Sequence, residues 1–365
     1  MKFSISKEKF LAGLLQVQNV VSTRTTLPIL SNVLIEAEGN GLQLTTTDLD
    51  VGISGHVEAE VETPGAVTLP ARKLATIIKE LPSDQIQVSV NGDNVASIEC
   101  GPSFFKILGL DADEFPPLAD FDDPKVFKLE QKTLKDGLKK TGYAISTDET
   151  RYVLNGINCT FKENTMTLVA TDGRRLAMMD HELEFPESNE IAVIIPTKAV
   201  NEVQRLLRDE GEVTILIGHN QIAFELNGSR LVSKLIDGNY PNYRQVIPGE
   251  AKYRIPLERE TFLESVRRVS LLASDKSNSI KLEFSENVIS IMANSPDIGE
   301  AKETITVKYK GPNMAIAFNP EFLMAPLRNL DTDEVYMELI DEMSPGVIKI
   351  NVPFLYVLMP MRVTN

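Results

Sequence analysis

Residues 151–172 read RYVLNGINCTFKENTMTLVATD, with two alternating segments on either side of Lys162-Glu163-Asn164. Alternation of apolar and polar residues is typical of half-buried strands, and residues such as Asn favour a chain reversal. The stretch therefore predicts a β-hairpin. The same pattern returns at residues 27–48, LPILSNVLIEAEGNGLQLTTTD, and at residues 277–295, SNSIKLEFSENVISIMANS. Three copies of one pattern, far apart in the chain, indicate an internal repeat.

Each hairpin follows a short alternating segment and then an amphipathic one. An apolar residue in the first segment and one in the second lie 11 positions apart in every copy. The three pairs are Phe3 and Leu14, Phe127 and Leu138, and Ile255 and Val266. Between them, apolar residues recur at helical spacing, so the pattern predicts a strand and a helix before each hairpin.

A second helix is predicted after each hairpin, at residues 70–81, 196–207 and 319–330. A proline stands at or near the start of all three segments, where its missing N–H has no intrahelical partner to lose. Pro326 lies inside the third segment and is expected to kink that helix or end it early. The strand-like segments that close the copies lie at residues 86–90 and 95–100, 213–217 and 221–226, and 335–339 and 347–352.

The order of strand, helix, strands, helix and strands predicts an α+β fold with antiparallel sheets. Polar, proline-rich stretches around Pro116-Pro117 and Pro248-Gly249 are typical of linkers. We therefore expect three tandem, similar domains at residues 1–122, 123–248 and 249–365. Three near-equal copies without a catalytic motif favour a scaffold, and three domains with independent roles are the alternative.

The composition fits an ordinary globular protein, with 42% hydrophobic and 24% charged residues in 365. No apolar run approaches the roughly 18 residues of a membrane span, and the first residues lack the apolar core of a signal peptide. A cytoplasmic location is therefore expected. Cys100 and Cys159 favour buried thiols over a disulfide framework. Three isolated histidines give no ligand spacing for a transition metal, so no metal is expected.

The net charge of −15 argues against a simple DNA-binding domain, whose footprint is usually basic. The charge is segregated, however. The predicted helices together carry a net charge of +7, so the rest of the chain carries −22. Their segments are residues 7–20, 71–81, 131–141, 197–209, 258–274 and 320–330. Such a partition suits basic helices that face DNA and an acidic remainder that repels it.

Several segments, in order along the chain, resemble bacterial DNA polymerase III β subunits, the sliding clamps. The resemblance runs from Met1 to Val363 with few gaps. Its most specific segments are Thr26-Leu27-Pro28-Ile29-Leu30, Arg151-Tyr152-Val153-Leu154-Asn155-Gly156, Val169-Ala170-Thr171-Asp172-Gly173-Arg174-Arg175-Leu176, Ser233-Lys234-Leu235-Ile236-Asp237-Gly238, Tyr240-Pro241-Asn242-Tyr243 and Met359-Pro360-Met361-Arg362.

This resemblance implies a ring of two chains closed head to tail, with helices lining a central hole and antiparallel sheets outside. The implied function is non-enzymatic: the ring encircles double-stranded DNA and makes the polymerase processive. Its implied partners are the polymerase III catalytic subunit, an ATP-driven clamp-loader complex and other clamp-binding proteins of replication and repair. No cofactor is expected, because the ATP belongs to the loader. Phosphate contacts carry no sequence information, so such a ring can slide.

The basic residues of the predicted helices are the candidate DNA contacts, and Arg24 matches a family position near DNA. The helix candidates are Lys7, Lys9, Arg72, Lys73, Lys79, Lys132, Lys135, Lys139, Lys140, Lys198, Arg205, Arg208, Arg267, Arg268 and Arg328. Solvated surface lysines and arginines are the alternative interpretation of each single residue. The segments at 258–274 and 320–330 carry no net charge, so their share in DNA contact is expected to be the smallest.

The resemblance further implies a pocket between the second and third domains that takes a partner peptide with a Gln and large apolar residues. The matching residues are Arg151, Tyr152, Leu154, Thr171, Asp172, Gly173, Arg174, Arg175, Leu176, Pro241, Arg244, Val246, Val357, Leu358, Met359, Pro360, Met361 and Arg362. Methionine adapts to several partners, and arginines can supply a polar rim. Replacing both Met361 and Leu176 with alanine is expected to weaken peptide binding alone.

Two departures from the family pattern bear on this pocket. Arg174 stands where relatives often have His, and the Ser344-Pro345-Gly346 turn replaces a serine-rich segment. Both are expected to shift the preferred peptide. Taken without the resemblance, Met359-Pro360-Met361 would be an ordinary strand packed on the core.

Ring closure would join the first domain of one chain to the third domain of the other. The matching interface positions are Lys73, Phe105, Leu271 and Leu272.

The competing hypothesis is a tandem-domain enzyme that acts on DNA or nucleotides. Its candidate carboxylates are Asp48 and Asp50, Asp111, Asp113 and Glu114, and Asp120, Asp122 and Asp123, all in polar stretches that favour solvated loops. The chain contains neither a P-loop nor a Gly-x-Ser-x-Gly segment.

Overall fold

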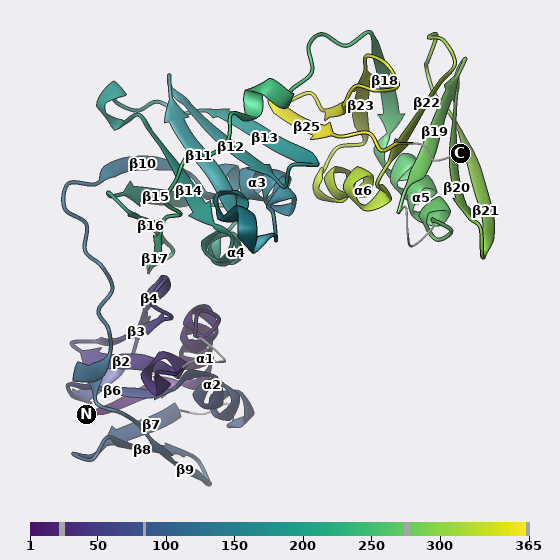
Figure 1. The fold of residues 1–365 in the computed structure, drawn as a ribbon. Coiled ribbons are helices and arrows are strands. Elements are labelled where there is room, and N and C mark those ends of the chain that lie inside the picture. Colours follow the sequence, from purple (N-terminus) through teal and green to yellow (C-terminus); the bar gives the residue numbers. More distant parts are fainter. Residues whose placement is uncertain (22–25, 83–84, 274–277, 363–365) are drawn as a thin grey trace. The chain divides into compact units, whose positions relative to one another are not determined.

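The structure, a computed structural model, describes residues 1–21, 26–82, 85–273 and 278–362. Three copies of one element order follow each other along the chain (Figure 1). The first copy consists of β1 (Lys2–Ser6), α1 (Lys7–Val17), β2 (Asn32–Glu38), β3 (Gly41–Thr47), β4 (Val51–Glu58), β5 (Glu60–Thr63), β6 (Gly65–Pro70), α2 (Ala71–Glu80), β7 (Gln85–Val90), β8 (Val95–Cys100) and β9 (Ser103–Leu108).

The other two copies repeat this order without the short strand β5. The second consists of β10 (Lys125–Glu130), α3 (Gln131–Thr141), β11 (Gly156–Lys162), β12 (Thr165–Thr171), β13 (Arg175–Glu182), β14 (Ile191–Pro196), α4 (Thr197–Leu206), β15 (Glu212–Ile217), β16 (Gln221–Leu226) and β17 (Ser229–Lys234). The third consists of β18 (Tyr253–Glu258), α5 (Arg259–Ser270), β19 (Ile280–Ser285), β20 (Val288–Ser295), β21 (Gly299–Thr306), β22 (Met314–Phe318), α6 (Pro320–Asn329), β23 (Glu334–Leu339), β24 (Gly346–Lys349) and β25 (Phe354–Leu358).

Local sequence explains these elements. The apolar helix residues that the repeat predicts are all buried: Phe10, Leu14, Leu134, Leu138, Phe262 and Val266. The turn from β11 to β12 holds Glu163 at φ 51° and Asn164 at φ 55°. Positive φ at both central residues is the requirement of the tight hairpin turn that matches strand twist, so the predicted hairpin is confirmed. Asn319 caps α6 by accepting hydrogen bonds from the N–H groups of Glu321 and Phe322.

Pro326 does not end its helix, so that alternative of the sequence-based expectation is wrong. Helix α6 continues to Asn329, and the N–H of Leu330 still bonds the Pro326 carbonyl at 3.0 Å. A proline leaves the carbonyl four residues earlier without its donor, here that of Phe322. The hydroxyl of Tyr356 donates to this carbonyl oxygen at 2.7 Å. The helix therefore keeps its interior acceptor satisfied.

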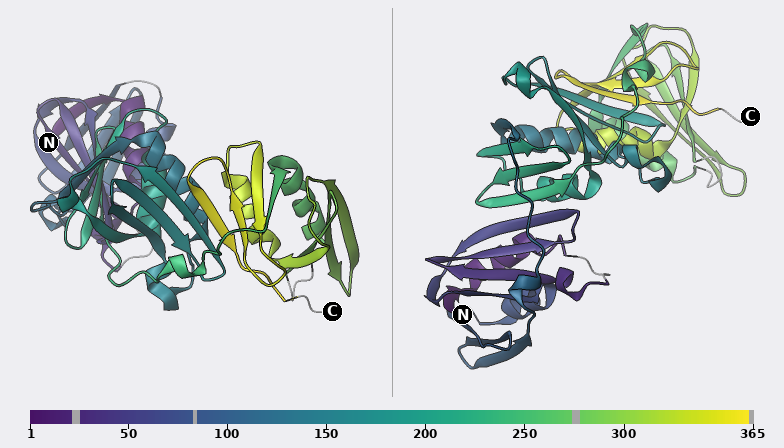
Figure 2. Two further views of the ribbon diagram at one scale, coloured as in Figure 1. Left: turned by 90° about the horizontal axis from the view of Figure 1, so that it is seen from above. Right: turned by 60° about the vertical axis from the view of Figure 1, so that its left-hand side comes forward.

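The strands form four antiparallel sheets. Two are small: β5-β1-β7-β8-β9 and β21-β20-β19-β22. Two contain eight strands each, in the orders β10-β15-β16-β17-β4-β3-β2-β6 and β14-β11-β12-β13-β25-β24-β23-β18. Each large sheet joins two copies of the repeat, because β17 pairs with β4 and β13 pairs with β25. Helices α1 and α2 pack together, as do α5 and α6, and they contact strands of the adjoining sheets (Figures 1 and 2).

Compact packing follows these sheets and divides the chain into two units. The first unit contains Met1–Lys135 and Lys198–Leu235, and the second contains Asp136–Thr197 and Ile236–Asn365. Each unit thus holds one end copy of the repeat and part of the middle copy. The three domain limits predicted above follow the repeat instead, and they stay a prediction. Among the described residues, no helix has the length and apolarity that a membrane crossing requires.

Candidate functional site

The residues predicted to bind a partner peptide gather around the strand pair β13 and β25 in the second unit. Leu176 lies opposite Val357 in this pair, and Arg175 lies opposite Leu358. The pairing continues beyond the strands, because the N–H of Met359 donates to the carbonyl of Arg174 at 3.0 Å. Two segments far apart in sequence, 174–176 and 357–359, are thereby fixed side by side. The N–H of Met361 donates instead to the carbonyl of Ala317 at 2.7 Å.

The apolar members of this set form a buried floor. Leu176 and Val357 are each 1% exposed and cluster with Val169. Tyr240, Tyr243 and other half-buried side chains pack against this cluster. Leu154 and Leu358 are also buried. Replacing Leu176 with alanine would therefore open a cavity in the core, so the expectation that this change removes pocket surface alone is wrong.

The turn between β12 and β13 is tightly bonded. Asp172 accepts hydrogen bonds from the N–H groups of Arg174 and Arg175 at 2.9 and 3.1 Å. The Thr171 hydroxyl donates to the Arg175 carbonyl at 2.6 Å and accepts from the N–H of Gly173 at 3.1 Å. Gly173 has φ 85°, a conformation that side chains disfavour. This network fixes where the exposed Arg174 side chain starts.

Arg175 is used inside the protein rather than on its surface. Its Nε donates to Asp172 at 3.1 Å, and its side chain is only 14% exposed. The guanidinium lies 4.5 Å from the centroid of the Phe322 ring and 6.0 Å from that of Tyr143. A cation over two aromatic rings and paired with a carboxylate is well stabilised when partly buried. Arg175 thus joins β13 to α6.

Burial raises the pKa values of the Tyr143 and Tyr356 hydroxyls, so both stay neutral at physiological pH. Their rings pack at a centroid distance of 5.8 Å under the β13–β25 pair. Sequence reasoning did not find Tyr143, Phe322 or Tyr356 as supporting residues. No local pattern marks them, because each reaches the site only through tertiary packing.

Other members of the predicted set form an accessible surface around this floor, which we call the peptide surface. Its exposed members are Arg151, Tyr152, Gly173, Arg174, Pro241, Arg244, Val246 and Arg362, and its half-buried members are Met359, Pro360 and Met361. Tyr152, at 58% exposure, and Val246, at 39%, are large hydrophobic side chains that solvent reaches. The short helices Glu149–Leu154 and Tyr243–Val246 carry them. The arrangement offers apolar contact area with an arginine rim, which suits an extended peptide.

A hollow of about 60 Å³ lies beyond Val246 and was not predicted. Ile247, Pro248, Val347 and Leu355 are among its lining residues, and Pro345 of the Ser344-Pro345-Gly346 turn is another. The Ser344-Pro345-Gly346 turn therefore contributes to the surface next to the short helix Tyr243–Val246.

In the first unit, the candidate DNA contacts fall into two groups. Lys198 donates to Asp48 and to the Val20 carbonyl, and Arg205 donates to the carbonyl of Gln16. These two cations hold the middle copy of the repeat to the first copy. Further partners are Glu58 for Lys9, Asp209 for Lys135, Glu202 for Arg205 and the Leu81 carbonyl for Lys7. Exposed cations that form no ion pair with a described carboxylate are Arg72, Lys73, Lys79, Lys132 and Arg208, although Lys132 still interacts electrostatically with Asp209.

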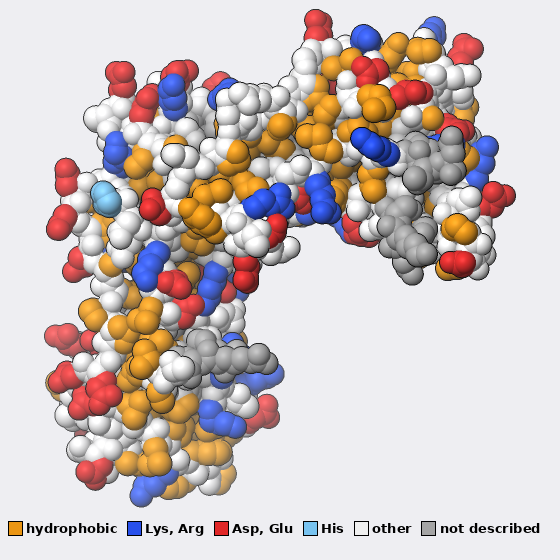
Figure 3. Space-filling model, in the orientation of Figure 1, with side chains coloured by type: hydrophobic (Ala, Val, Ile, Leu, Met, Phe, Trp, Pro, Cys, Tyr) orange, Lys and Arg blue, Asp and Glu red, His pale blue; other side chains and the backbone are white. Residues whose placement is uncertain are grey.

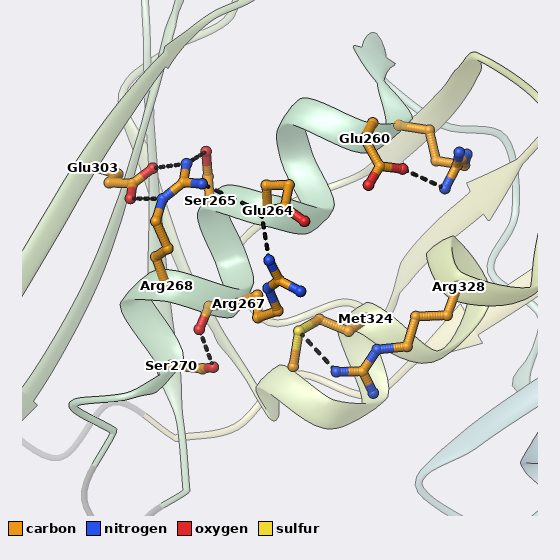
Figure 4. Close-up of polar contacts among 10 residues, drawn as sticks. Glu260, Glu264, Ser265, Arg267, Arg268, Ser270, Glu303, Met324 and Arg328 are labelled. Carbon is orange, nitrogen blue, oxygen red and sulfur yellow. Dashed lines mark hydrogen bonds and ion pairs between the residues drawn. The ribbon is translucent and has the colours of Figure 1, made fainter.

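In the second unit, every candidate cation of the described helices has a carboxylate partner. Lys139 pairs with Asp331 at 2.7 Å and Lys140 with Asp136 at 3.9 Å. Figure 4 shows the arginines of α5 and α6 with their partners: Arg267 with Glu264, Arg268 with Glu264 and Glu303, and Arg328 with Met324. Arg328 also pairs with Glu321 at 2.9 Å. Arg24 lies outside the described residues.

Three of the carboxylates that suggested an enzyme, Asp48, Asp50 and Asp111, have structural partners. Asp48 pairs with Lys198, and Asp50 pairs with Lys234 at 3.0 Å. Asp111 caps a short helix by accepting a hydrogen bond from the N–H of Asp113 at 2.9 Å. These contacts give Asp48, Asp50 and Asp111 structural roles.

The predicted interface residues lie near two exposed sheet edges. Phe105 is on β9, an edge strand of the five-stranded sheet, with Phe104 and Leu108 also exposed. Leu271, 78% exposed, and the half-buried Leu272 follow α5, which contacts the edge strand β21. Lys73 is exposed on α2. The sequence analysis did not single out Phe104, Leu108 and Ile298, which are also exposed, because exposure depends on the tertiary packing around them.

Three regions of the chain match descriptions of one family. Residues 1–119 match the N-terminal domain of the DNA polymerase III beta subunit, residues 128–242 its central domain, and residues 244–362 its C-terminal domain. Relatives described as beta sliding clamps include those of Chlamydia muridarum, 36% identical over 99% of both chains, and Pseudomonas aeruginosa, 36% identical over 99% of this chain and 100% of the relative.

Solved structures agree with these matches over the whole chain. A sliding clamp from Pseudomonas aeruginosa bound to griselimycin superimposes with a TM-score of 0.96 at 36% identity, and one from Bacillus subtilis with 0.95 at 31% identity, each covering 100% of both chains. The fold is therefore that of three tandem clamp domains. The chain belongs to the DNA polymerase III beta subunit family, and its function is that of a non-catalytic DNA sliding clamp for this polymerase in DNA replication.

Proposed function

We propose that two copies of this chain close head to tail into a ring around duplex DNA, with β9 of one copy paired to β21 of the other. The observation that carries this proposal is the pair of uncovered sheet edges. Strand β9 exposes Phe105 at 38% and Leu108 at 76%, and Ile298, next to β21, is 71% exposed. An apolar edge strand left open is a template for pairing with another chain.

Each copy supplies one edge of each kind, so a head-to-tail dimer covers all four edges and leaves no end for further growth. Closure of a heterologous contact into a cycle has this property. Leu271 and Leu272 would add apolar area beside β21, and Lys73 would lie at the rim beside β9. In this proposal the three domains have the limits 1–122, 123–248 and 249–365, and the family matches fall close to them.

The six long helices would line the hole, with their cations toward the DNA phosphates. Arg24 belongs to this set by its family position. Since phosphates are the same at every base pair, the ring would bind without sequence preference and slide. The acidic remainder of the chain would repel DNA outside the hole.

The peptide surface with its buried floor would receive an extended peptide from the polymerase III catalytic subunit. The same surface would serve the clamp-loader complex and other clamp-binding proteins, so these partners would exclude one another. Exposed Tyr152 and half-buried Met361 would contact the large apolar residues of the peptide, and the arginine rim would hold its polar groups. This activity would take place in the cytoplasm.

The closure is tested by light scattering on the purified protein and on Leu108→Lys. The proposal expects a mass of twice 40.5 kDa for the wild type. Because Leu108 is 76% exposed, lysine there leaves the core intact but puts charge into the proposed contact, so a single-chain mass is expected. Leu49→Lys, at another exposed leucine of the same unit, should remain a dimer. A single-chain wild type, or a Leu108→Lys dimer of unchanged stability, would contradict the proposal.

A further inference from the structure

We infer that the first unit holds the DNA through its unpaired cations, whereas glutamates neutralise the arginines of α5 and α6 and keep them off the phosphates. The inference rests on the proposed arrangement in which these helices face DNA. It divides the candidate cations into DNA contacts and internally paired residues. Glu264, Glu303 and Glu321 are positioning residues in this division.

The arginines of α5 are bound by carboxylates from their own helix and from β21 (Figure 4). Arg267 Nη2 lies 2.7 Å from Glu264. Arg268 donates through Nε and Nη2 to the two oxygens of Glu303, at 2.6 and 2.9 Å. Such a fork of two charge-assisted hydrogen bonds is the strongest geometry that arginine offers to an anion. A phosphate would have to displace it.

On α6 the single cation is satisfied in the same way. Arg328 lies 2.9 Å from Glu321 and 3.4 Å from the sulfur of Met324. The ion pairs within the protein affect the free energy of DNA binding. Counterion release drives phosphate binding only when a cation takes the place of a counterion, and a cation that must first leave a carboxylate gains little.

In the first unit, the cations of helix α2 differ from those of α5 and α6, because they are exposed to solvent. Its buried face consists of Ala71, Leu74, Ala75 and Ile78, which leaves Arg72, Lys73 and Lys79 in solvent. Arg72 and Lys79 are seven residues apart and therefore lie on one face. Neither has a carboxylate partner among the described residues. Figure 3 shows Lys and Arg side chains on the part of the surface where Figure 1 draws α2.

Two more unpaired cations of the first unit lie at helix ends. Lys132 is exposed in the first turn of α3, and Arg208 is exposed just after α4. The backbone N–H of Arg208 bonds the Gln131 side chain at 2.9 Å, so both cations belong to elements tied together. Each ring would thus hold DNA at two equivalent basic patches, one per copy.

The test compares two double variants that remove the same charge. Arg72→Gln/Lys79→Gln removes unpaired cations, and Arg267→Gln/Arg268→Gln removes paired ones. The full-length dimer is titrated onto a fluorescent 30-base-pair duplex at several salt concentrations, and the slope of log Kobs against log salt is measured. The slope changes by about 0.9 for each phosphate contact. We expect Arg72→Gln/Lys79→Gln to lower its magnitude by about one or more and Arg267→Gln/Arg268→Gln by less than about 0.3.

A gain-of-binding variant tests the glutamates directly. Glu264→Gln/Glu303→Gln should free Arg267 and Arg268 and raise the salt slope and the affinity, the affinity about tenfold at low salt. Glu286→Gln, at an exposed turn residue without an ion-pair partner in the described chain, should change the affinity less than twofold. Adding Arg267→Gln/Arg268→Gln to the glutamine pair should cancel the gain. Light scattering confirms that each variant is a dimer.

If Arg72→Gln/Lys79→Gln and Arg267→Gln/Arg268→Gln lower the salt slope equally, the inference is overturned. This holds whatever the result for Glu264→Gln/Glu303→Gln. This result is distinguishable from failure of the proposed function. A wild type that binds duplex but is not retained on closed circles after loading would contradict the ring. Retention on circles together with equal slopes would contradict only the division of cations.

Discussion

The hydroxyl of Tyr356, on β25, lies 2.7 Å from the carbonyl oxygen of Phe322 and takes the place of the N–H that Pro326 lacks. The same Phe322 carries the Arg175 guanidinium 4.5 Å from its ring centroid. One turn of α6 thus accepts a hydrogen bond from the C-terminal strand β25 and carries a ring that contacts a cation from β13. These two contacts link the strands of the floor under the peptide surface to α6.

Tyr356→Phe should therefore cost about 1–3 kcal/mol in the free energy of unfolding, because a buried carbonyl loses its donor. In a Pro326→Ala background the new N–H can donate to Phe322, so the cost of Tyr356→Phe should fall below about 1 kcal/mol. The chain has no tryptophan, so urea unfolding at fixed protein concentration is followed by circular dichroism.

Tyr336→Phe serves as the control for this cycle, since the hydroxyl of Tyr336 donates to the exposed Glu334. It should cost less than about 0.5 kcal/mol. Equal costs of Tyr356→Phe with and without Pro326 would show that the hydroxyl does not replace the missing helical donor.

Partner binding should depend on accessible side chains and not on the buried floor. Tyr152→Ala and Met361→Ala should each weaken a labelled synthetic peptide with one Gln and large apolar residues about tenfold, near 1.4 kcal/mol. Fluorescence anisotropy measures the affinity. Met292→Ala, a half-buried methionine on β20, should leave it unchanged. Unchanged affinity in both Tyr152→Ala and Met361→Ala would show that the peptide does not bind at this surface.

The contact between Lys139 and Asp331 should make stability depend on pH. The hydrogen bond that Lys139 donates lowers the pKa of the Asp331 carboxyl below its ordinary 3.8. A group whose pKa is lower in the folded state stabilises above its ordinary pKa and loses that effect as pH falls through the folded value. Because Asp331 is 69% exposed, the contribution at neutral pH is small, about 0.2–1 kcal/mol.

Asp331→Asn should therefore melt below the wild type at pH 6, and the difference should close as the pH falls below 3.8. Differential scanning calorimetry from pH 6 to pH 3 measures both curves. Asp122→Asn, at an exposed aspartate away from the proposed contact between copies, should show no such convergence. A difference that stays constant or widens in acid would exclude the ion pair as its cause.

Short-range patterns predicted the elements well because their causes are local. The second helices were predicted at residues 70–81, 196–207 and 319–330, and the structure has them at Ala71–Glu80, Thr197–Leu206 and Pro320–Asn329. Proline or asparagine at the start and periodic apolar residues determine those limits. The strand predicted at residues 347–352 ends at Lys349, because Asn351 and Val352 are exposed.

Long-range pairing could not be predicted in the same way. Strand β17 joins β4, and β13 joins β25, without any pattern that marks these partners in sequence. The ion pairs are equally non-local. Counting charges assigned Lys198 to DNA, whereas it is bound to Asp48 and the Val20 carbonyl. Alternation likewise shows on which side of its strand Leu176 lies. It does not show that other side chains cover Leu176 on that side.

Retention on nicked circular DNA distinguishes a closed ring from a protein that only binds the DNA surface. The dimer is loaded with the matching clamp loader and ATP, washed in high salt, and counted before and after the circle is cut. A closed ring predicts that the protein stays on circles in high salt and leaves once the DNA is linear, and that Leu108→Lys is not retained. Release that follows salt and ignores linearisation would contradict encirclement, because such binding is only electrostatic.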